Sequence, residues 1–335
     1  MAQLLGLILL SLFVTAILLV PFIDFLYKMK FRRIKQKTVD MFNKPTPTFD
    51  KFNNSKAGTP VGGGILIIVV VCVLTFWAYG ILNTNIKAWE VFAIMFTFIS
   101  FGVLGFYDDL KKLVSGHDTF FGLRFRHKFV IQWGLALVVA SVLYFELGYS
   151  YIFIRGFGLA SLGFLFIPFA AFVIVAFSNA FNIADGLDGL ASGLLLICLA
   201  AFLAITSNQL DQPLGIFIAV LMGSVGAFLY FNIYKARIWL GDVGALSLGA
   251  VLAVIGLLTG KIIALAFIGG VFVIEIASSL IQIIAKKFFR KKVFPASPFH
   301  LLLQKIGWDE PKIVMRAWLL GFFFAILGLY IAFIQ

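Results

Sequence analysis

The sequence has few charged residues and very few cysteines. Charged side chains make up 13% of the 335 residues, about half the share that is usual in soluble domains, which excludes a soluble globular protein. Cys72 and Cys198 both lie in apolar runs, far apart in the chain, so a disulfide framework and a cysteine-rich metal site are also excluded. Because no polar stretch is long enough for a separate soluble domain, we expect one integral membrane domain over residues 1–335.

Hydrophobic residues make up 62% of the chain, and they collect in runs of roughly 20, the length that an α-helix needs to cross a bilayer. The first run is too long for the apolar core of a signal peptide and has no basic residue before it, so we interpret it as a retained span. We therefore predict an all-α, polytopic membrane protein with about ten spans, at 2–23, 61–80, 90–106, 129–147, 162–181, 189–207, 213–232, 243–259, 261–285 and 314–334.

The basic residues predict the orientation of these spans. Five segments (24–58, 107–128, 182–188, 233–242 and 286–313), together with the residues beside them, hold 24 of the 27 Lys and Arg residues. The connections on the other side hold Lys87, Arg155 and Lys261. Since cytoplasmic loops are enriched in Lys and Arg, the five segments are predicted to be cytoplasmic and both termini to lie on the opposite side. The same distribution explains the net charge of +12 without a nucleic-acid partner.

The ninth run, 261–285, is unusual because glycine and polar residues interrupt it. Gly269 and Gly270 lie near its middle, and Glu275 and Ser279 follow one helical turn apart. We expect a kinked helix with a polar face toward the bundle.

Five of the fifteen acidic residues lie at the ends of apolar runs, all on the predicted cytoplasmic face: Asp108, Asp109, Asp185, Asp188 and Asp242. Adjacent carboxylates such as those of Asp108 and Asp109 repel each other, unless a cation compensates them or they point apart. A hard divalent ion such as Mg²⁺ takes oxygen ligands and usually also binds substrate phosphates. The alternative is that each aspartate caps a helix. Three acidic clusters on one face favour a metal-dependent site for phosphoryl transfer.

Glycines and lysines accompany these aspartates. Glycine lets backbone amides approach a phosphate closely, and such glycines occur at 58–64 and around Asp188 and Asp242. Lys56, Lys112 and Lys128 are candidate phosphate contacts. The alternatives are that the glycines serve helix packing and that the lysines mark topology.

Several segments together resemble the polyprenyl-phosphate N-acetylhexosamine-1-phosphate transferases. The similarity rests on AGTPVGGGILI at 57–67, FGVLGFYDDLKKL at 101–113, NAFNIADGLDGLASG at 179–193, ARIWLGDVGALSLGA at 236–250 and SPFHLLLQKIGWDEPKIVMRAW at 297–318. These segments occur in the family's order from the second to the tenth span, and the expected span count agrees.

Within this family the segments are most similar to the muramoyl-pentapeptide branch, and this resemblance implies the reaction. Undecaprenyl phosphate attacks UDP-MurNAc-pentapeptide at its β-phosphate, which forms lipid I and UMP for peptidoglycan biosynthesis, with Mg²⁺ as cofactor. The resemblance also implies a homodimer in the bacterial cytoplasmic membrane with the active site on the cytoplasmic face.

The resemblance further implies roles for individual residues. Asp242 is the expected Mg²⁺ ligand, Asp108 and Asp109 are the expected catalytic pair, and His300 is a further catalytic candidate. One of the pair is expected to deprotonate the lipid phosphate, and a covalent aspartyl intermediate stays open as an alternative. An aromatic ring at Trp239 is suited to stack on the uracil base. The expected substrate-binding residues are Lys56, Thr59, Lys112, Lys128, Asn179, Asn182, Asp185, Gly186, Leu187, Asp188 and Trp239.

One segment departs from the branch pattern. The muramoyl-pentapeptide branch usually has three consecutive histidines after Pro-Leu, whereas this chain reads Pro298-Phe299-His300-Leu301-Leu302. An alternative is therefore a relative that transfers GlcNAc-1-phosphate or another sugar phosphate to the same lipid. A non-catalytic transporter or lipid-binding protein is the alternative from another class. It does not require five aspartates on one face, because carriers place ionisable residues near the middle of the membrane.

Overall fold

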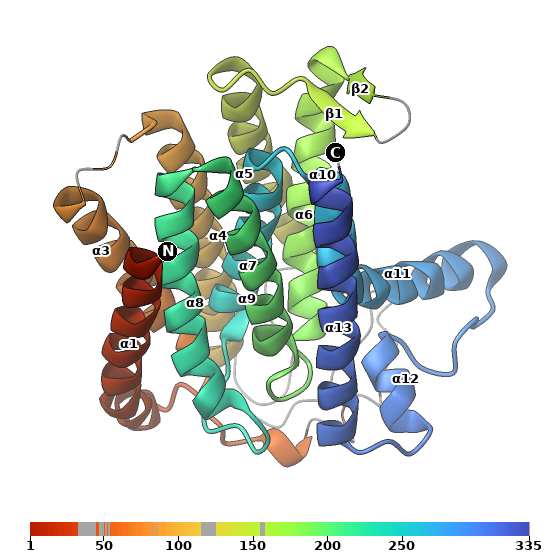
Figure 1. Ribbon diagram of the computed structural model, residues 1–335. Coiled ribbons are helices and arrows are strands. Elements are labelled where there is room, and N and C mark those ends of the chain that lie inside the picture. The colour runs from red at the N-terminus through yellow and green to blue at the C-terminus, as the bar shows by residue number, and fades with distance from the viewer. Residues whose placement is uncertain are drawn as a thin grey trace.

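The computed structural model describes residues 1–32, 45–46, 50, 52, 54–82, 84, 86–114, 125–154 and 158–334. In this part of the chain, long α-helices form one bundle (Figure 1). Nine of them are long and apolar enough to cross a membrane: α1 (Ala2–Lys28), α3 (Gly63–Ile81), α4 (Ala88–Val114), α5 (Phe125–Phe145), α6 (Phe166–Ala184), α7 (Leu190–Gln209), α8 (Gln212–Asn232), α9 (Gly241–Leu258) and α13 (Glu310–Phe333). They correspond to nine of the ten predicted runs, so a helical, multi-pass architecture is confirmed.

The remaining predicted span is divided between two helices. α10 (Ile262–Ile268) and α11 (Gly270–Ile284), which a π-helical turn (Ala285–Phe289) extends, are bent by 81° relative to each other. At the junction, a Cβ on Gly269 would lie 2.6 Å from the ring of Phe177, so only glycine fits there. In Figure 1, α11 points sideways out of the bundle, and α12 (Phe299–Lys305) lies below it. A count of ten spans needs α10 and α11 to cross the membrane as one unit, and that stays a prediction.

One element departs from the all-α prediction. Strand β1 (Tyr151–Ile154) pairs antiparallel with β2 (Gly158–Ser161), and Tyr151 lies opposite Ser161. The β1 sequence, Tyr-Ile-Phe-Ile, consists only of β-branched and aromatic residues, which suit a strand. The fold is therefore a helical bundle with one small hairpin, which corrects the purely helical prediction.

The two ends of the bundle differ in chemistry. The hairpin lies at one end, together with both chain termini: the hydroxyl of Ser207 near the end of α7 donates to the sulfur of Met1 over 3.6 Å, and the C-terminus lies beside the hairpin in Figure 1. The opposite end carries the end of α4 and the beginnings of α9 and α13. The predicted site residues lie at this second end. Which end faces the cytoplasm stays a prediction.

Helix α9 is the central helix of the bundle. Every residue from Val243 to Leu258 is buried, and α3, α4, α6, α7 and α10 pack around it. Outer helices such as α1 and α13 instead leave large apolar side chains exposed, among them Ile17 and Phe323. Large exposed apolar surfaces mark membrane or protein contacts. Because α9 is held from all sides, the position of Asp242 in its first turn is fixed by the core.

Two glycines bring α3 and α4 into backbone contact with the first turn of α9. A Cβ on Gly105 of α4 would lie 2.1 Å from the carbonyl oxygen of Asp242, and a Cβ on Gly64 of α3 would lie 2.3 Å from the Cα of Gly244. Small residues allow membrane helices to approach this closely. Asp108 and Asp109 follow Gly105 within about one helical turn, so this contact sets their distance from Asp242.

We expect Gly105→Ala to separate α4 from α9, because the added methyl group meets backbone atoms that cannot move aside. The free energy of unfolding should fall by about 1–3 kcal/mol, measured as a lower melting temperature of the detergent-solubilised protein. Gly134→Ala in α5 is the matched control, since a Cβ there meets nothing within 4 Å. Equal melting temperatures for the two variants would contradict the close approach.

Candidate active site

Three aspartates and two lysines meet where α4, α5 and α9 come together. Asp108, Asp109 and Lys112 lie on the last turns of α4, Lys128 on the first turn of α5, and Asp242 on the first turn of α9. The helices extend beyond the apolar runs, so these residues of the predicted cytoplasmic segments 107–128 and 233–242 lie on helices. Rigid helices therefore hold all five side chains.

The ammonium group of Lys112 is the centre of this acidic cluster. Its Nζ lies 3.1 Å from Asp108 Oδ2, 3.9 Å from Asp109 Oδ1 and 2.9 Å from Asp242 Oδ2. Lys128 also contacts Asp242 Oδ2, and its Nζ lies 3.1 Å from Asp108 Oδ2. Two cations thus offset three carboxylates, which removes most of the repulsion that adjacent aspartates cause.

The adjacent Asp108 and Asp109 have different environments. Asp109 Oδ2 accepts a hydrogen bond from the backbone N–H of Val243 over 3.1 Å, so Asp109 caps the N-terminus of α9. A Cβ on Gly241 would lie 2.6 Å from the same oxygen, which explains the glycine there. Asp108 faces the two lysines instead. Asp109 therefore binds the first turn of α9 from a neighbouring helix, and Asp108 is the member of the pair that contacts both lysines of Asp242.

The asparagines of α6 divide between two places. Asn182 donates from its amide to Asp242 Oδ1 over 3.1 Å, so it belongs to the cluster and orients this carboxylate. Asn179 lies almost one turn earlier and donates to Gln132 Oε1 over 2.9 Å and to the Val175 carbonyl over 2.8 Å. The structure therefore brings Asn182 into the acidic cluster, whereas Asn179 links α6 to α5 through Gln132.

The donor set suits a hard divalent cation. Asp242 Oδ2 and Asp108 Oδ2 share the same two ammonium groups, so both oxygens already face a common cationic position. Among the described residues, no group of three or more His, Cys, Asp or Glu side chains forms a ready metal cage. Mg²⁺ is typically bound by one or two carboxylates, with waters and substrate phosphates completing its shell. The residues present therefore fit Mg²⁺, and Asp242 as its ligand stays a prediction.

A second ionic cluster surrounds Lys56, which ends the short helix η1 (Asn54–Lys56). Its Nζ lies 3.1 Å from Asp188 Oδ1, 2.5 Å from Glu310 Oε1 and 3.4 Å from the Gly186 carbonyl oxygen. Glu310 Oε1 also accepts from the backbone N–H of Asp188 over 2.6 Å. Lys56 thus joins the segment before α3 to the loop before α7 and to the start of α13.

Trp239 and Thr59 lie beside this cluster. The ammonium of Lys56 is 4.8 Å from the centroid of the Trp239 ring, within the range of a cation–π contact. The Trp239 backbone is bound on both sides: its N–H donates to Pro60 over 2.9 Å, and its carbonyl accepts from Gly63 over 2.9 Å. The Trp239 ring is buried, so Lys56 covers the face on which a base was predicted to stack. Thr59 follows the turn at 57–58, and its backbone N–H donates to the Lys56 carbonyl over 3.5 Å.

The loop between α6 and α7 is shorter than the predicted segment 182–188, because α6 continues to Ala184 and α7 begins at Leu190. Asp185 ends α6 and is partly exposed, whereas the Leu187 side chain is buried in the hydrophobic core. The Leu187 side chain is therefore not available to a ligand, and its carbonyl accepts from the backbone N–H of Leu190 over 3.2 Å. Asp188 Oδ2 accepts from the backbone N–H of Ala236 over 3.0 Å.

Sequence reasoning missed Asn232, whose side chain forms hydrogen bonds with this loop and with the start of α7. Its Oδ1 accepts from Gly189 N over 3.1 Å and from Ser192 Oγ over 3.0 Å, while its amide donates to the Ile238 carbonyl over 2.9 Å. Glu310 was also missed as a site residue. Both lie within or beside segments that carry the family resemblance, so motif position was a signal that could have found them.

His300 lies apart from both ionic clusters, on α12. Its Nδ1 is 3.0 Å from Glu275 Oε2, and its backbone N–H donates to Glu275 Oε1 over 3.1 Å. The other ring nitrogen, Nε2, faces Gly186, where a Cβ would lie only 2.7 Å away. The structure thus brings His300 against the α6–α7 loop.

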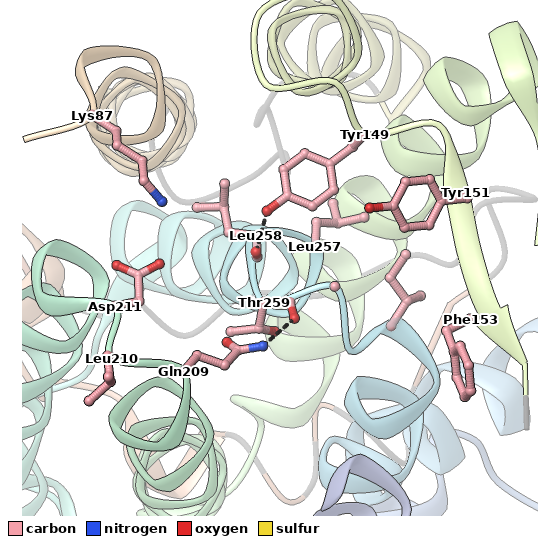
Figure 2. Close-up of a pocket in the computed structure, with 12 residues that line it drawn as sticks. Lys87, Tyr149, Tyr151, Phe153, Gln209, Leu210, Asp211, Leu257, Leu258 and Thr259 are labelled. Atoms are coloured by element: carbon pink, nitrogen blue, oxygen red, sulfur yellow. Dashed lines mark hydrogen bonds between the residues drawn. The ribbon is translucent and has the colours of Figure 1, made fainter. Parts of the chain in front are cut away.

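A cavity of about 470 Å³ lies at the opposite end of the bundle, beside the hairpin (Figure 2). Its polar side chains are engaged by the end of α9: the Tyr149 hydroxyl donates to the Leu258 carbonyl, and Gln209 Nε2 donates to the Thr259 carbonyl over 3.0 Å. Burial, together with the nearby carboxylates of Glu90 and Asp211, raises the pKa of Tyr149, which keeps this hydroxyl a donor. This cavity contains none of the predicted site residues, and its polar groups terminate a helix.

Comparison with known proteins identifies the class to which the chain belongs. Residues 91–260 match the family described as Glycosyl transferase family 4. This range contains all the aspartates and lysines of the acidic cluster. The class is therefore a membrane-embedded transferase.

Relatives narrow the class further. A phospho-N-acetylmuramoyl-pentapeptide-transferase of Geobacillus sp. (strain WCH70) is 37% identical over 330 residues, which covers 97% of this chain and 96% of the relative. Proteins of the same name from Borreliella afzelii (strain PKo) and Rickettsia felis (strain ATCC VR-1525 / URRWXCal2) are 37% and 36% identical, over 82% and 90% of this chain and 82% and 86% of their own lengths. The chain belongs to the phospho-N-acetylmuramoyl-pentapeptide-transferase family.

We expect Lys56→Met to destabilise the protein, because it leaves the buried carboxylates of Asp188 and Glu310 beside each other without a cation. Breaking a buried pair costs about 3 kcal/mol, which a lower melting temperature in detergent would report. Lys305→Met is the matched control: its exposed ammonium donates to the Pro295 carbonyl over 2.9 Å, so its loss should cost less than about 1 kcal/mol. Adding Glu310→Gln to Lys56→Met should restore part of the stability. Equal stability of the single and double variants would contradict the pairing.

Proposed function

We propose that this protein transfers phospho-MurNAc-pentapeptide from UDP-MurNAc-pentapeptide to undecaprenyl phosphate, producing lipid I and UMP for peptidoglycan biosynthesis. The observation that carries this proposal is the meeting of Asp108 and Asp242 with Lys112 and Lys128 at one end of the bundle, in a chain that is similar to named transferases over nearly its whole length. In the reaction, a phosphate oxygen of the lipid bonds to the β-phosphorus of the donor. The bond between this phosphorus and the bridging oxygen breaks, and UMP leaves.

The two lysines are the phosphate-binding groups of this proposal. Asp242, Lys112 and Lys128 are the most exposed members of the acidic cluster, so an incoming phosphate meets them first. Phosphoryl transfer depends on positioning and charge neutralisation, and a donor phosphate oxygen can replace a carboxylate as the partner of either ammonium. Mg²⁺ at Asp242, when bound, supplies further neutralisation of the phosphate charge.

The two adjacent aspartates take different roles. Asp109 is engaged by the backbone of α9, which suits a residue that fixes the distance between α4 and α9. Asp108 lies beside both lysines, where the phosphate of the lipid is expected, and accepts its proton. A lysine that moves from Asp108 to the phosphate frees the Asp108 carboxylate for this transfer. A covalent intermediate on one of these carboxylates stays open as the alternative route.

The nucleotide end of the donor is assigned to the cluster around Lys56. The loop Asp185–Asp188, Thr59 and Trp239 gather there, and Asn182 links this loop to Asp242. For uracil to stack on Trp239, the Lys56 ammonium has to leave the ring. Lys56 contacts Asp188 and Glu310 from that same position, so this movement also rearranges both ion pairs.

The site is assigned to the cytoplasmic face, because UDP-activated donors are made in the cytoplasm and the described lysines Lys56, Lys112 and Lys128 of the basic segments lie at this end of the bundle. Both termini then lie on the outer side of the bacterial cytoplasmic membrane. A homodimer follows from the family resemblance. Sedimentation in detergent tests the dimer.

Asp242→Asn is expected to abolish Mg²⁺-dependent release of UMP while the protein remains folded. Asparagine preserves the shape and the bond from Asn182 but removes the charge that holds the cation and both lysines. We expect UMP release to fall by at least about 100-fold at an unchanged elution volume in detergent. The control is Asp211→Asn at the opposite end, where the side chain caps α8 and asparagine caps as well as aspartate. Wild-type activity of Asp242→Asn would remove this residue from the metal site.

The sugar specificity is tested by offering the purified protein UDP-MurNAc-pentapeptide and UDP-GlcNAc in parallel, each with undecaprenyl phosphate and Mg²⁺. We expect lipid-linked product and UMP from the muramoyl donor. Product from UDP-GlcNAc alone would favour a sugar-phosphate transferase of another branch, and no UMP from either donor would favour a non-catalytic protein.

A further inference from the structure

Glu275 is a buried carboxylate that the proposed reaction does not yet use. It lies on α11, inside an apolar helix, with a side chain only 3% exposed. Placing a charge in such an environment is costly, so its partners matter. His300 is its ion-pair partner among the described residues.

Both carboxylate oxygens of Glu275 are directed at His300. Oε1 accepts the backbone N–H of His300 over 3.1 Å, and Oε2 lies 3.0 Å from the ring Nδ1. The first contact fixes where α12 begins, and the second fixes the rotation of the ring. An ionised carboxylate only accepts hydrogen bonds, so an ionised Glu275 requires a proton on Nδ1.

The opposite edge of the ring faces the loop between α6 and α7. Nε2 lies so close to Gly186 that a Cβ there would be 2.7 Å away, and the Gly186 carbonyl binds Lys56. His300 is thus clamped between Glu275 on one side and the backbone of this loop on the other. The clamp determines which nitrogen faces the candidate site.

We propose that Glu275 is a positioning residue that keeps the His300 proton on Nδ1 and directs Nε2 toward the loop between α6 and α7. This inference rests on the proposed function, since it assigns His300 a task in the same site. A neutral His300 then offers Nε2 as a proton acceptor, and a charged His300 offers Nε2–H as a donor to phosphate. Both states need the ring orientation that Glu275 imposes.

The position of the proton can be observed directly. The chain contains three histidines, so long-range ¹H–¹⁵N spectra of ¹⁵N-histidine-labelled protein in detergent are simple, and comparison with His300→Gln assigns the His300 signals. At about pH 8, above the ordinary pKa of histidine, we expect a protonated Nδ1 in the wild type. A wild-type ring with its proton on Nε2 alone would overturn the proposal, because Glu275 would then be the donor. This measurement needs no folded variant of Glu275.

Kinetics separate positioning from a purely structural role. Glu275→Gln should shift the proton toward Nε2 and lower kcat by about 10- to 100-fold, with the KM for the nucleotide donor nearly unchanged. Glu275→Asp keeps the charge and should recover part of kcat. Ser279→Ala, one turn further along the buried face of α11, is the matched control and should retain both spectrum and kcat. An unaltered kcat in Glu275→Gln contradicts the inference. Wild-type protein that releases no UMP but shows the Nδ1 proton contradicts the proposed function instead.

Discussion

The candidate site depends on one backbone contact, the approach of Gly105 in α4 to the first turn of α9. No side chain separates the two helices there, because a Cβ on Gly105 would fall 2.1 Å from the Asp242 carbonyl oxygen. This approach allows Asp109 to accept the Val243 N–H and allows Lys112 to reach Asp108, Asp109 and Asp242 at once. The charged cluster costs free energy of desolvation, and close helix packing in the apolar core below it offsets that cost. Burial of α9 along its whole length is therefore what makes a dense charge cluster tolerable at its first turn.

The two ionic clusters share connections, so they form one site. Asn182 binds Asp242 from α6, and the loop that follows α6 carries Gly186 and Asp188, which bind Lys56. The strand-like contact of Trp239 with Pro60 and Gly63 fixes the start of α9 to the start of α3. A ligand that displaces Lys112 or Lys56 from its carboxylates changes the charge balance of both clusters. In this structure the lysines occupy the positions in which a cation or a phosphate is expected, so the proposed function requires that substrate binding exchanges their ionic partners.

Much of this could be predicted from the sequence, because the bilayer restricts what an apolar run can form. The runs predicted the nine long helices, and the positions of the aspartates at run ends predicted that Asp108 and Asp242 belong to one face. The hairpin at 151–161 was missed, since a short connection between spans has no strong period. The helix ends were not predictable where amphipathic turns extend a helix past its apolar run, as at Lys112 and Lys128. The hydrogen-bond partners of polar side chains were not predictable either. Spacing alone does not reveal that Asp109 accepts from the Val243 N–H or that Asn179 binds Gln132.

The polar face of α11 was expected to point toward the bundle, and its polar side chains Glu275 and Gln282 bind the chain that returns from α11. Gln282 Oε1 accepts the backbone N–H groups of Val293 and Phe294 over 3.1 and 2.9 Å, and its amide donates to the Phe294 carbonyl over 3.1 Å. Two turns earlier, Glu275 binds His300. The chain that returns from α11 is thus fastened to α11 itself at both ends of the segment 293–300. A straight continuation of α10 would carry Glu275 and Gln282 along the bundle axis, whereas the 81° bend places them where the returning chain runs. The location of His300 beside the α6–α7 loop therefore depends on the bend at Gly269.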